Sequence, residues 1–296
     1  MAHLHEEKIK ELELKANEIR TSLLESLIAA KSGHTAGPLG MADIFTAFYF
    51  HVLHHDPKNP MMEDRDRLVL SNGHITPIRY ATMAHAGYFP VEELKTLRKF
   101  GTKLQGHPER VTMPALETTS GPLGSGLGQA AGIALGAKMD GKKFRVYCIM
   151  SDGEQDAGNI WESAMFAAKY GLNNLTAVMD RNNIQINGNT EDIMPLEPIR
   201  EKYESFNWHV IECNAHDFED FIGAVEEAKT VTEKPTLILA HTIPGKGIPQ
   251  IENDYRWHGC PPGDGPEDVF PKAKQGEEFL HILAQERIAI EEAHRH

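Results

Sequence analysis

Two short stretches of the chain decide its fold. Residues 144–154 read FRVYCIMSDGE, and residues 175–183 read LTAVMDRNN. Each is a largely apolar run that stops at an aspartate, and residues 159–170 between them have a helical pattern. A short apolar run bounded by turn residues is typical of a strand that is buried on both faces of a parallel sheet. The pair predicts a strand–helix–strand unit with Asp152 and Asn182 at its strand ends.

The sequence on either side extends this unit in both directions. Further strands are predicted at 67–71, 208–213 and 236–240, and helices at 4–31, 41–53, 91–100, 217–230 and 277–294. A glycine- and proline-rich turn is expected at 33–40 and a long irregular loop at 101–120. Such alternation predicts an α/β fold, doubly wound, with a mostly parallel sheet and helices on both faces. Without repeats or an internal linker, residues 1–296 are expected to form a single domain.

Length, composition and charge narrow the class of protein. The chain has 296 residues, of which 41% are hydrophobic and 25% charged, as in soluble globular proteins. No run approaches the ~18 apolar residues of a membrane span, and the N-terminus lacks a signal-peptide core, so we expect a cytoplasmic protein. A net charge of −13 argues against nucleic acid or anionic membrane as partners. The three cysteines lie far apart and form no disulfide framework.

Polar residues follow the predicted strands at the places where ligands bind. In an open parallel sheet the ligand lies at the carboxyl ends of the strands. Polar side chains stand beside glycine or asparagine after four of the predicted strands: 71–74, 151–154, 180–183 and 241–247. Because four strand ends agree, we expect one binding site along this edge of the sheet.

Asp152 and Asn182 predict a metal site at that edge. Asn182 lies thirty residues after Asp152, across one strand–helix–strand crossover, which brings both side chains to the same rim. A carboxylate, an amide and nearby backbone carbonyls form an incomplete oxygen shell, suited to Mg²⁺ or Ca²⁺ with positions left for water and phosphates. An Asp-Gly turn alone would explain Asp152 but not the pair.

Glycines form a second pattern, in the helix that begins near residue 124. Gly124, Gly128, Gly132 and Gly136 recur every four residues, which would let this helix pack close to the sheet or to a ligand. Gly126-x-Gly128-x-x-Ala131 also resembles a dinucleotide fingerprint, but the segment before it is not a predicted strand. A nicotinamide-dependent dehydrogenase is therefore kept as an alternative.

These motifs together resemble a known family. Ser151-Asp152-Gly153-Glu154 followed by Asp180-Arg181-Asn182-Asn183 resembles the GDG…NN signature of thiamine diphosphate enzymes. Further segments resemble transketolase and stand in transketolase order: Ser32-Gly33-His34, Asp56-Pro57-Lys58-Asn59-Pro60, residues 65–74, Gly106-His107-Pro108-Glu109, Gly121-Pro122-Leu123-Gly124 and Trp257-His258-Gly259. The resemblance runs from about residue 20 to 262 and implies the diphosphate-binding type of the thiamine diphosphate-binding fold.

The resemblance also implies which residues hold the cofactor. Asp152, Asn182 and the carbonyl of Ile184 match the ligands of Mg²⁺, for which Ca²⁺ or Mn²⁺ can substitute. Gly153 matches a backbone group on the diphosphate. The remaining matches are to groups near the phosphates and thiazolium (His74, Lys246) and beside the pyrimidine (Gly121, Leu123).

Three histidines match the catalytic imidazoles of the family. His34, His107 and His258 correspond to side chains that hold the sugar hydroxyls and move protons. Moving a two-carbon ketol unit requires proton transfers near neutral pH, for which imidazole is suited.

The sequence departs from the family at two positions. Ser151 stands where the family usually has glycine, and Ala157 stands where it usually has glutamate. In the family that glutamate belongs to a carboxylate network at the dimer interface. We therefore expect either that Asp156 takes over this role or that communication between active sites is weakened.

The chain matches only part of a transketolase. The 37 residues after Gly259 are too few for the pyrimidine-binding and C-terminal domains, which we expect on a partner chain in an α₂β₂ assembly. The resemblance thus implies the N-terminal subunit of a split transketolase, which moves a two-carbon ketol unit reversibly from ketose phosphate to aldose phosphate, as in the pentose phosphate pathway. Alternatives are the α subunit of a 2-oxo acid dehydrogenase, disfavoured by Gly106-His107-Pro108-Glu109 and Trp257-His258-Gly259, and a non-catalytic binding subunit, disfavoured by the histidine set.

Overall fold

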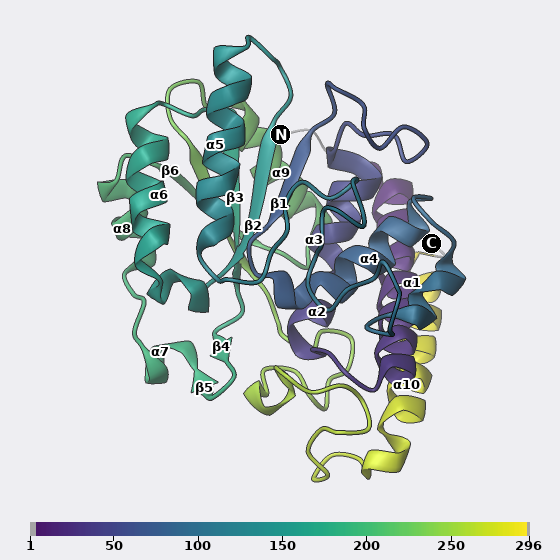
Figure 1. Cartoon of the computed structure of the whole chain (residues 1–296). Coiled ribbons are helices and arrows are strands. Elements are labelled where there is room, and N and C mark those ends of the chain that lie inside the picture. Colours follow the sequence, from purple (N-terminus) through teal and green to yellow (C-terminus); the bar gives the residue numbers. More distant parts are fainter. Residues whose placement is uncertain (1–3, 295–296) are drawn as a thin grey trace.

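The computed structural model describes residues 4–294 and is built on a five-stranded parallel sheet (Figure 1). The strands lie in the order β1-β2-β3-β7-β6 and all neighbours pair in parallel. Their bounds are β1 (Arg67–Leu70), β2 (Val146–Ser151), β3 (Leu175–Arg181), β6 (His209–Asn214) and β7 (Thr236–His241). The predicted fold class is confirmed, and the carboxyl ends of all five strands meet at one edge.

Helices cover both faces of this sheet. One face packs against α1 (Glu6–Ala30), α3 (Ala42–Ala47), α4 (Thr76–His85) and α9 (Phe218–Thr230), and the other against α5 (Ser125–Met139), α6 (Gly158–Lys169) and α8 (Ile199–Ser205). Helix α10 (Lys272–Ala293) lies along the outside of α1. Within residues 4–294 no helix combines the length and the apolar character that crossing a membrane would require.

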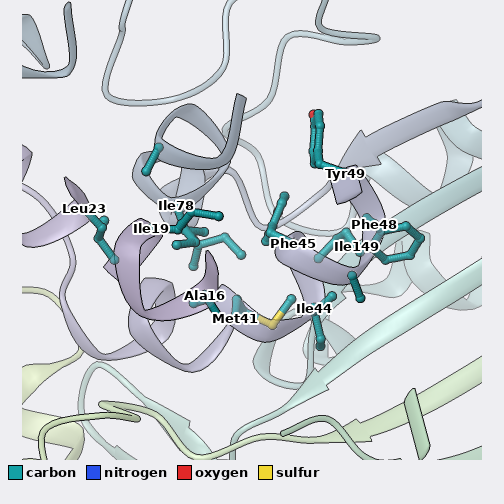
Figure 2. Close-up of a cluster of buried hydrophobic side chains, with 14 of the residues drawn as sticks. Ala16, Ile19, Leu23, Met41, Ile44, Phe45, Phe48, Tyr49, Ile78 and Ile149 are labelled. Atoms are coloured by element: carbon teal, nitrogen blue, oxygen red, sulfur yellow. The ribbon is translucent and has the colours of Figure 1, made fainter. Parts of the chain in front are cut away.

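Each strand contributes to two hydrophobic cores, because successive side chains of a strand point to opposite faces. Ile149 and Val178 belong to the larger core, which Figure 2 shows around α1 and α3, whereas Cys148 and Ala177 belong to the core beneath α5 and α6. Burial on both faces explains why these strands are continuously apolar.

Short elements occupy the segments between the main ones. They are α2 (Ala36–Gly40), α7 (Thr190–Ile193), the antiparallel pair β4 (Ile184–Gln185) and β5 (Gly188–Asn189), a π-helix (Phe48–Val52) and 3-10 turns at Gly73–Ile75, Val91–Thr96, Gly153–Asp156 and Tyr255–Trp257.

Several predicted elements differ in form from those in the structure. The turn expected at 33–40 contains α2, whose Pro38 lies in the first turn, where proline fits a helix. The helix expected at 41–53 changes to a π-helix after Ala47. The one expected at 91–100 is a 3-10 helix that ends before Arg98, a residue with a left-handed φ of 58°. Helix α10 begins at Lys272, directly after Pro271, five residues earlier than expected.

The glycine stripe of α5 packs less closely than predicted. Its first half does pack closely, since a Cβ on Gly124 would lie 2.8 Å from the Cβ of Ala157 and one on Gly128 3.0 Å from Ser163 Oγ. Gly126, which lies off the stripe, approaches the sheet: its Cβ would lie 2.6 Å from the Cα of Ser71. A Cβ on Gly132 or Gly136 would contact nothing, and both residues are exposed. The buried face of the helix is instead lined by alanines such as Ala130 and Ala134. The expectation of close packing along the whole stripe is therefore wrong for its second half.

A buried ionic cluster fixes the loop after β7. Asp43 Oδ2 accepts from Arg20 Nη2 at 2.6 Å and from His216 Nδ1 at 2.6 Å. Burial alone would raise the pKa of Asp43, but Arg20 and His216 lower it to about 2. The other nitrogen of His216 accepts from the backbone N–H of Ile243 at 2.8 Å, which ties this loop to α1 and α3.

Candidate active site

A cavity of about 500 Å³ opens at the carboxyl ends of the strands. It is lined by His34, His74, His107, Gly121, Leu123, Ser151, Asp152, Gly153, Asn182, Ile184, Gln185, Ile186, Asn187 and His258. Every site residue expected from the sequence contributes to this wall except Lys246. The segments that supply them are far apart in sequence and meet because parallel strands end at the same edge.

Asp152 lies at the end of β2 with its carboxylate buried. Its Oδ2 accepts from Arg181 Nη1 at 3.0 Å and from the backbone N–H of Asn183 at 2.8 Å. Oδ1 accepts one bond within the described chain, from Gly153 N at 2.7 Å, and so keeps lone pairs for a cation. Burial raises the pKa of Asp152, and the bond to Arg181 opposes that rise.

Asp180 fixes the orientation of Asn182. The Asn182 amide donates to Asp180 Oδ2 at 2.8 Å, and the hydroxyl of Thr242 donates to the other oxygen of that carboxylate. Burial raises the pKa of Asp180 to about 7. Because the amide nitrogen is held by Asp180, the amide oxygen of Asn182 points elsewhere, where it accepts from Ile184 N at 3.0 Å. Such outer contacts orient metal ligands in proteins.

Together, Asp152, Asn182 and Ile184 fit a hard divalent cation. All three line the same cavity, and they offer a carboxylate oxygen, an amide oxygen and a backbone carbonyl. Oxygen donors of this kind are what Mg²⁺ and Ca²⁺ prefer.

Three of the predicted histidines form a compact cluster. The ring centroids of His34 and His74 are 5.0 Å apart, those of His74 and His258 5.2 Å, and those of His34 and His258 5.7 Å. The hydroxyl of Thr35 donates to the carbonyl of Cys260 at 2.6 Å, which holds together the segments that carry His34 and His258. The Nδ1 atoms of His34 and His258 are buried without a hydrogen-bond partner in the described chain, and both residues line the cavity.

The imidazoles of this cluster are held in the neutral form. Burial, followed by the neighbouring His258 and Arg98, lowers the pKa of His34 to about 4. Burial also lowers the pKa of His74 and of His258. At neutral pH these rings therefore accept hydrogen bonds as well as donate them.

His107 joins the cluster from the long loop. The ring packs beside Gly73, where an added Cβ would lie 3.2 Å from His107 Cδ2. The loop is anchored by Ser120, whose hydroxyl donates to the carbonyl of Ser71 at 3.1 Å and whose N–H donates to Pro108 O at 3.1 Å. Partial burial and the guanidinium of Arg98 lower the pKa of His107.

Lys246 lies in the loop after β7, outside the residues that line the cavity. Its side chain is half-buried, and the neighbouring Gly245 N–H donates to the carbonyl of Ala36 at 2.8 Å. The loop thus packs on α2, close to the segment that carries His34. A direct role for Lys246 at the cofactor stays a prediction.

Several residues of the site were not singled out from the sequence. The tip of the β4–β5 hairpin brings Gln185, Ile186 and Asn187 into the cavity wall, and the turn signal Asn187-Gly188 would have indicated this hairpin. Arg181 pairs with Glu191 and Glu197 as well as with Asp152, a set of contacts that depends on the tertiary fold.

The geometry of α5 also bears on the dinucleotide fingerprint. That motif requires a strand directly before the glycine turn. Here Gly126 and Gly128 lie in the first turns of α5, and the preceding residues 97–124 form irregular loop and turns. The structure therefore lacks, within the residues described, the strand on which a nicotinamide site of this type depends.

Comparisons with known proteins agree on one family. Residues 12–276 match the family described as transketolase, thiamine diphosphate binding domain. The chain is 37% identical over 274 residues to one subunit of the apulose-4-phosphate transketolase of Phocaeicola vulgatus, covering 92% of this chain and 97% of that protein. It is 43% identical over 248 residues to the 6-deoxy-6-sulfo-D-fructose transketolase subunit SqwG of Clostridium sp., covering 84% and 90% respectively.

A solved structure shares the fold but is a longer protein. The transketolase of Campylobacter jejuni superposes with a TM-score of 0.80 at 31% identity. The match covers 95% of this chain and 48% of that one. This chain thus spans about half of the solved transketolase and nearly all of the two separate subunits.

Proposed function

The chain belongs to the transketolase family through its thiamine diphosphate-binding domain, and on this basis we propose that it is the N-terminal subunit of a split transketolase. Residues 1–296 form a single diphosphate-binding domain in this proposal. The assembled enzyme transfers a two-carbon ketol unit reversibly from a ketose phosphate to an aldose phosphate. The observation that carries the proposal is that one cavity gathers the predicted metal ligands and the predicted histidines.

The predicted cofactor residues divide into those at the metal and diphosphate and those near the two rings of the cofactor. Asp152, Asn182 and the carbonyl of Ile184 would hold Mg²⁺, and the backbone of Gly153, whose N–H donates to Asp152 Oδ1, would lie beside the diphosphate. The turn at Gly121 and Leu123 borders the pyrimidine, with His74 and Lys246 near the phosphates and thiazolium. Thiamine diphosphate, when bound, supplies the nucleophilic carbon and the electron sink for ketol transfer.

His34, His107 and His258 hold the sugar hydroxyls and move their protons. Neutral imidazole accepts a proton at one nitrogen while the other can donate, so one ring can both bind a hydroxyl and receive its proton. Burial disfavours the protonated ring, and a proton taken from the substrate is therefore passed on rather than retained. Exclusion of water from the half-buried cluster strengthens each of these hydrogen bonds.

A partner chain completes the site. The names of both separate subunits indicate assemblies, and we extend this to a partner that carries the pyrimidine-binding and C-terminal domains in an α₂β₂ complex. Sugar phosphates of the pentose phosphate pathway are the default substrates, and specificity is shared with the partner. A cytoplasmic location is part of the same proposal.

Substitution of Asp152 tests the metal and cofactor assignment. Asp152→Ala is expected to abolish Mg²⁺-dependent binding of thiamine diphosphate, because it removes the charged ligand at the diphosphate end of the cavity. Asp152→Asn, which keeps the shape of the side chain, is expected to weaken binding by at least about tenfold. Isothermal titration calorimetry on the full chain, with Mg²⁺ present and absent, measures both.

The control is Asp140→Ala, at an exposed aspartate at the end of α5. It should bind the cofactor like the wild type, and circular dichroism should show all variants folded. Unchanged cofactor affinity in folded Asp152→Ala would refute the metal assignment.

A further inference from the structure

Glu154 is a buried carboxylate directly behind the cavity. It follows Gly153 in the 3-10 turn after β2, and its side chain is 1% exposed. It is not among the residues that line the cavity within the described chain, so it does not face a ligand there. Its hydrogen-bond donors are backbone amides and serine hydroxyls, all of them neutral.

The donors to Glu154 come from three separate segments. Oε1 accepts from the hydroxyl of Ser71, at the end of β1, and from Gly124 N, at the start of α5, at 3.3 Å. Oε2 accepts from Ser151 N at 3.1 Å and from the Ser151 hydroxyl at 3.3 Å. Ser71 Oγ in turn accepts from Gly126 N at 3.1 Å, which adds a second link to α5.

Each of these segments leads directly to cavity residues. Ser71 precedes the turn that carries His74, Gly124 follows the turn at Gly121 and Leu123, and Ser151 precedes Asp152 and Gly153. The three turns are not adjacent in the sequence, since they lie at the ends of different elements. A single side chain that bonds to all three therefore sets their relative positions.

We infer that Glu154 is a positioning residue that holds the three cofactor-facing turns in register. The inference deepens the proposed function, and its prediction for cofactor affinity rests on that function. In its ionised form a carboxylate suits this position, because it then only accepts and four donors converge on it. The amides of Gly124 and Ser151 would otherwise be buried without partners, at a cost in free energy for each. Ser151, where the family usually has glycine, supplies one of the four donors through its hydroxyl.

Glu154→Gln isolates this role, because it keeps the shape but turns one accepting atom into a donor. One pair of donors then faces an NH₂ group. In the full chain we expect backbone amide hydrogen exchange in 70–76, 121–126 and 150–154 to accelerate by about tenfold or more, as loss of such buried bonds implies. Exchange in the distant strands β6 and β7 should not change.

Glu162→Gln is the matched control, at an exposed glutamate of α6. It should exchange like the wild type. Unchanged exchange in the three turns of Glu154→Gln would overturn the inference, and so would an equal acceleration throughout the sheet, which signals general destabilisation.

Cofactor affinity separates positioning from a merely structural role. We expect Glu154→Gln to raise the dissociation constant of thiamine diphosphate with Mg²⁺ by about tenfold. A lower melting temperature with an unchanged dissociation constant would overturn the inference. If the wild type and Asp152→Ala bind the cofactor equally, it is the proposed function that fails, and the exchange pattern still decides whether Glu154 holds the turns.

Discussion

The rings of His34, His74 and His258 lie 5.0–5.7 Å apart at the cavity, whereas His55 and His216 each use both ring nitrogens within the fold. A histidine that is already bonded at both nitrogens has no atom left for a substrate. His34 and His258 line the cavity, and their Nδ1 atoms have no hydrogen-bond partner as far as the described chain extends. At the scale of single residues, hydrogen-bond occupancy thus separates His34 and His258, for which we propose a role in the site, from His55 and His216, whose rings serve the fold.

The low pKa of His34 predicts a specific dependence of stability on pH. In the folded chain this pKa is about 4, against about 6.5 when unfolded, so the unfolded state binds more protons between these values. The contribution of neutral His34 to stability is present above pH 6.5 and is lost as the pH falls toward 4. Relative to His34→Gln, the wild type should lose stability over this window, measured by urea unfolding at about pH 7.5, 5.5 and 4.5.

The comparison with His34→Gln is needed because other groups act in the opposite sense. Burial raises the pKa of Glu154 and of Asp180 to about 7, which favours the folded state as the pH falls. Both carboxyls are present in either protein, so the difference isolates His34. Parallel pH profiles for the two proteins would contradict the assignment of a buried, neutral His34.

A sequence pattern identifies a functional residue only when the residues next to it in the chain carry the signal. Asp152 and Asn182 stand next to glycine or asparagine at strand ends, and the site histidines lie beside glycine or in turn segments, a signal visible in the chain itself. Glu154 lies in the same motif, but its partner Ser71 is 83 positions away. The role of such a residue depends on which distant elements come into contact, and this could be seen only in the folded structure.

At the scale of elements, the two ends of α5 have different surroundings. Its start is pressed against the end of β1, where Gly126 meets Ser71, while Gly132 faces open space. Glycine within a helix costs up to ~1 kcal/mol relative to alanine. Close approach to the sheet explains Gly126 but not Gly132.

Alanine substitutions at these two glycines should have opposite effects. A Cβ at Gly126 would overlap the backbone of Ser71, so Gly126→Ala is expected to destabilise the chain by about 1–3 kcal/mol. Gly132→Ala meets nothing and should stabilise it by up to ~1 kcal/mol through helix propensity. Urea unfolding of the isolated chain measures both, and a change of the same sign in the two variants would contradict this account.

The long elements were predictable because their periodicity extends over many residues. Helix α1, the strands and α9 lie within a few residues of their predicted bounds. The β4–β5 hairpin, α7 and α8 were not predicted, since strands of two residues and helices of four to seven carry too little periodicity. The π-helix at Phe48–Val52 was not predicted either; its Phe48 ring packs against Tyr147 and Phe221.

At the scale of the whole molecule, the proposed function makes the residues around the cavity one part of a larger site, which the partner chain completes. The chain covers 48% of the solved Campylobacter jejuni transketolase and 97% of a separate transketolase subunit. With a net charge of −13, the chain would in this proposal hold the anionic cofactor by local groups such as backbone amides, histidines and a cation.

Ketol transfer is therefore expected only when the partner chain is present. The full chain alone should show no transfer between ketose and aldose phosphates, and mixing it with the co-purified partner should produce it. A coupled spectrophotometric assay over a panel of donors and acceptors measures this. Full activity of the chain alone would contradict the split enzyme, and activity on pyruvate but not on ketose phosphates would favour a 2-oxo acid dehydrogenase.

The small hairpin at the rim of the cavity has a consequence for how such a protein can evolve. Its strands are two residues long, and at its tip Ile186 is 65% exposed while still lining the cavity. Substitutions there change the shape of the pocket without disturbing either hydrophobic core. In the proposed function, selection for a new sugar can thus act on residues 185–187 while the sheet, the predicted metal ligands and the histidines remain as they are.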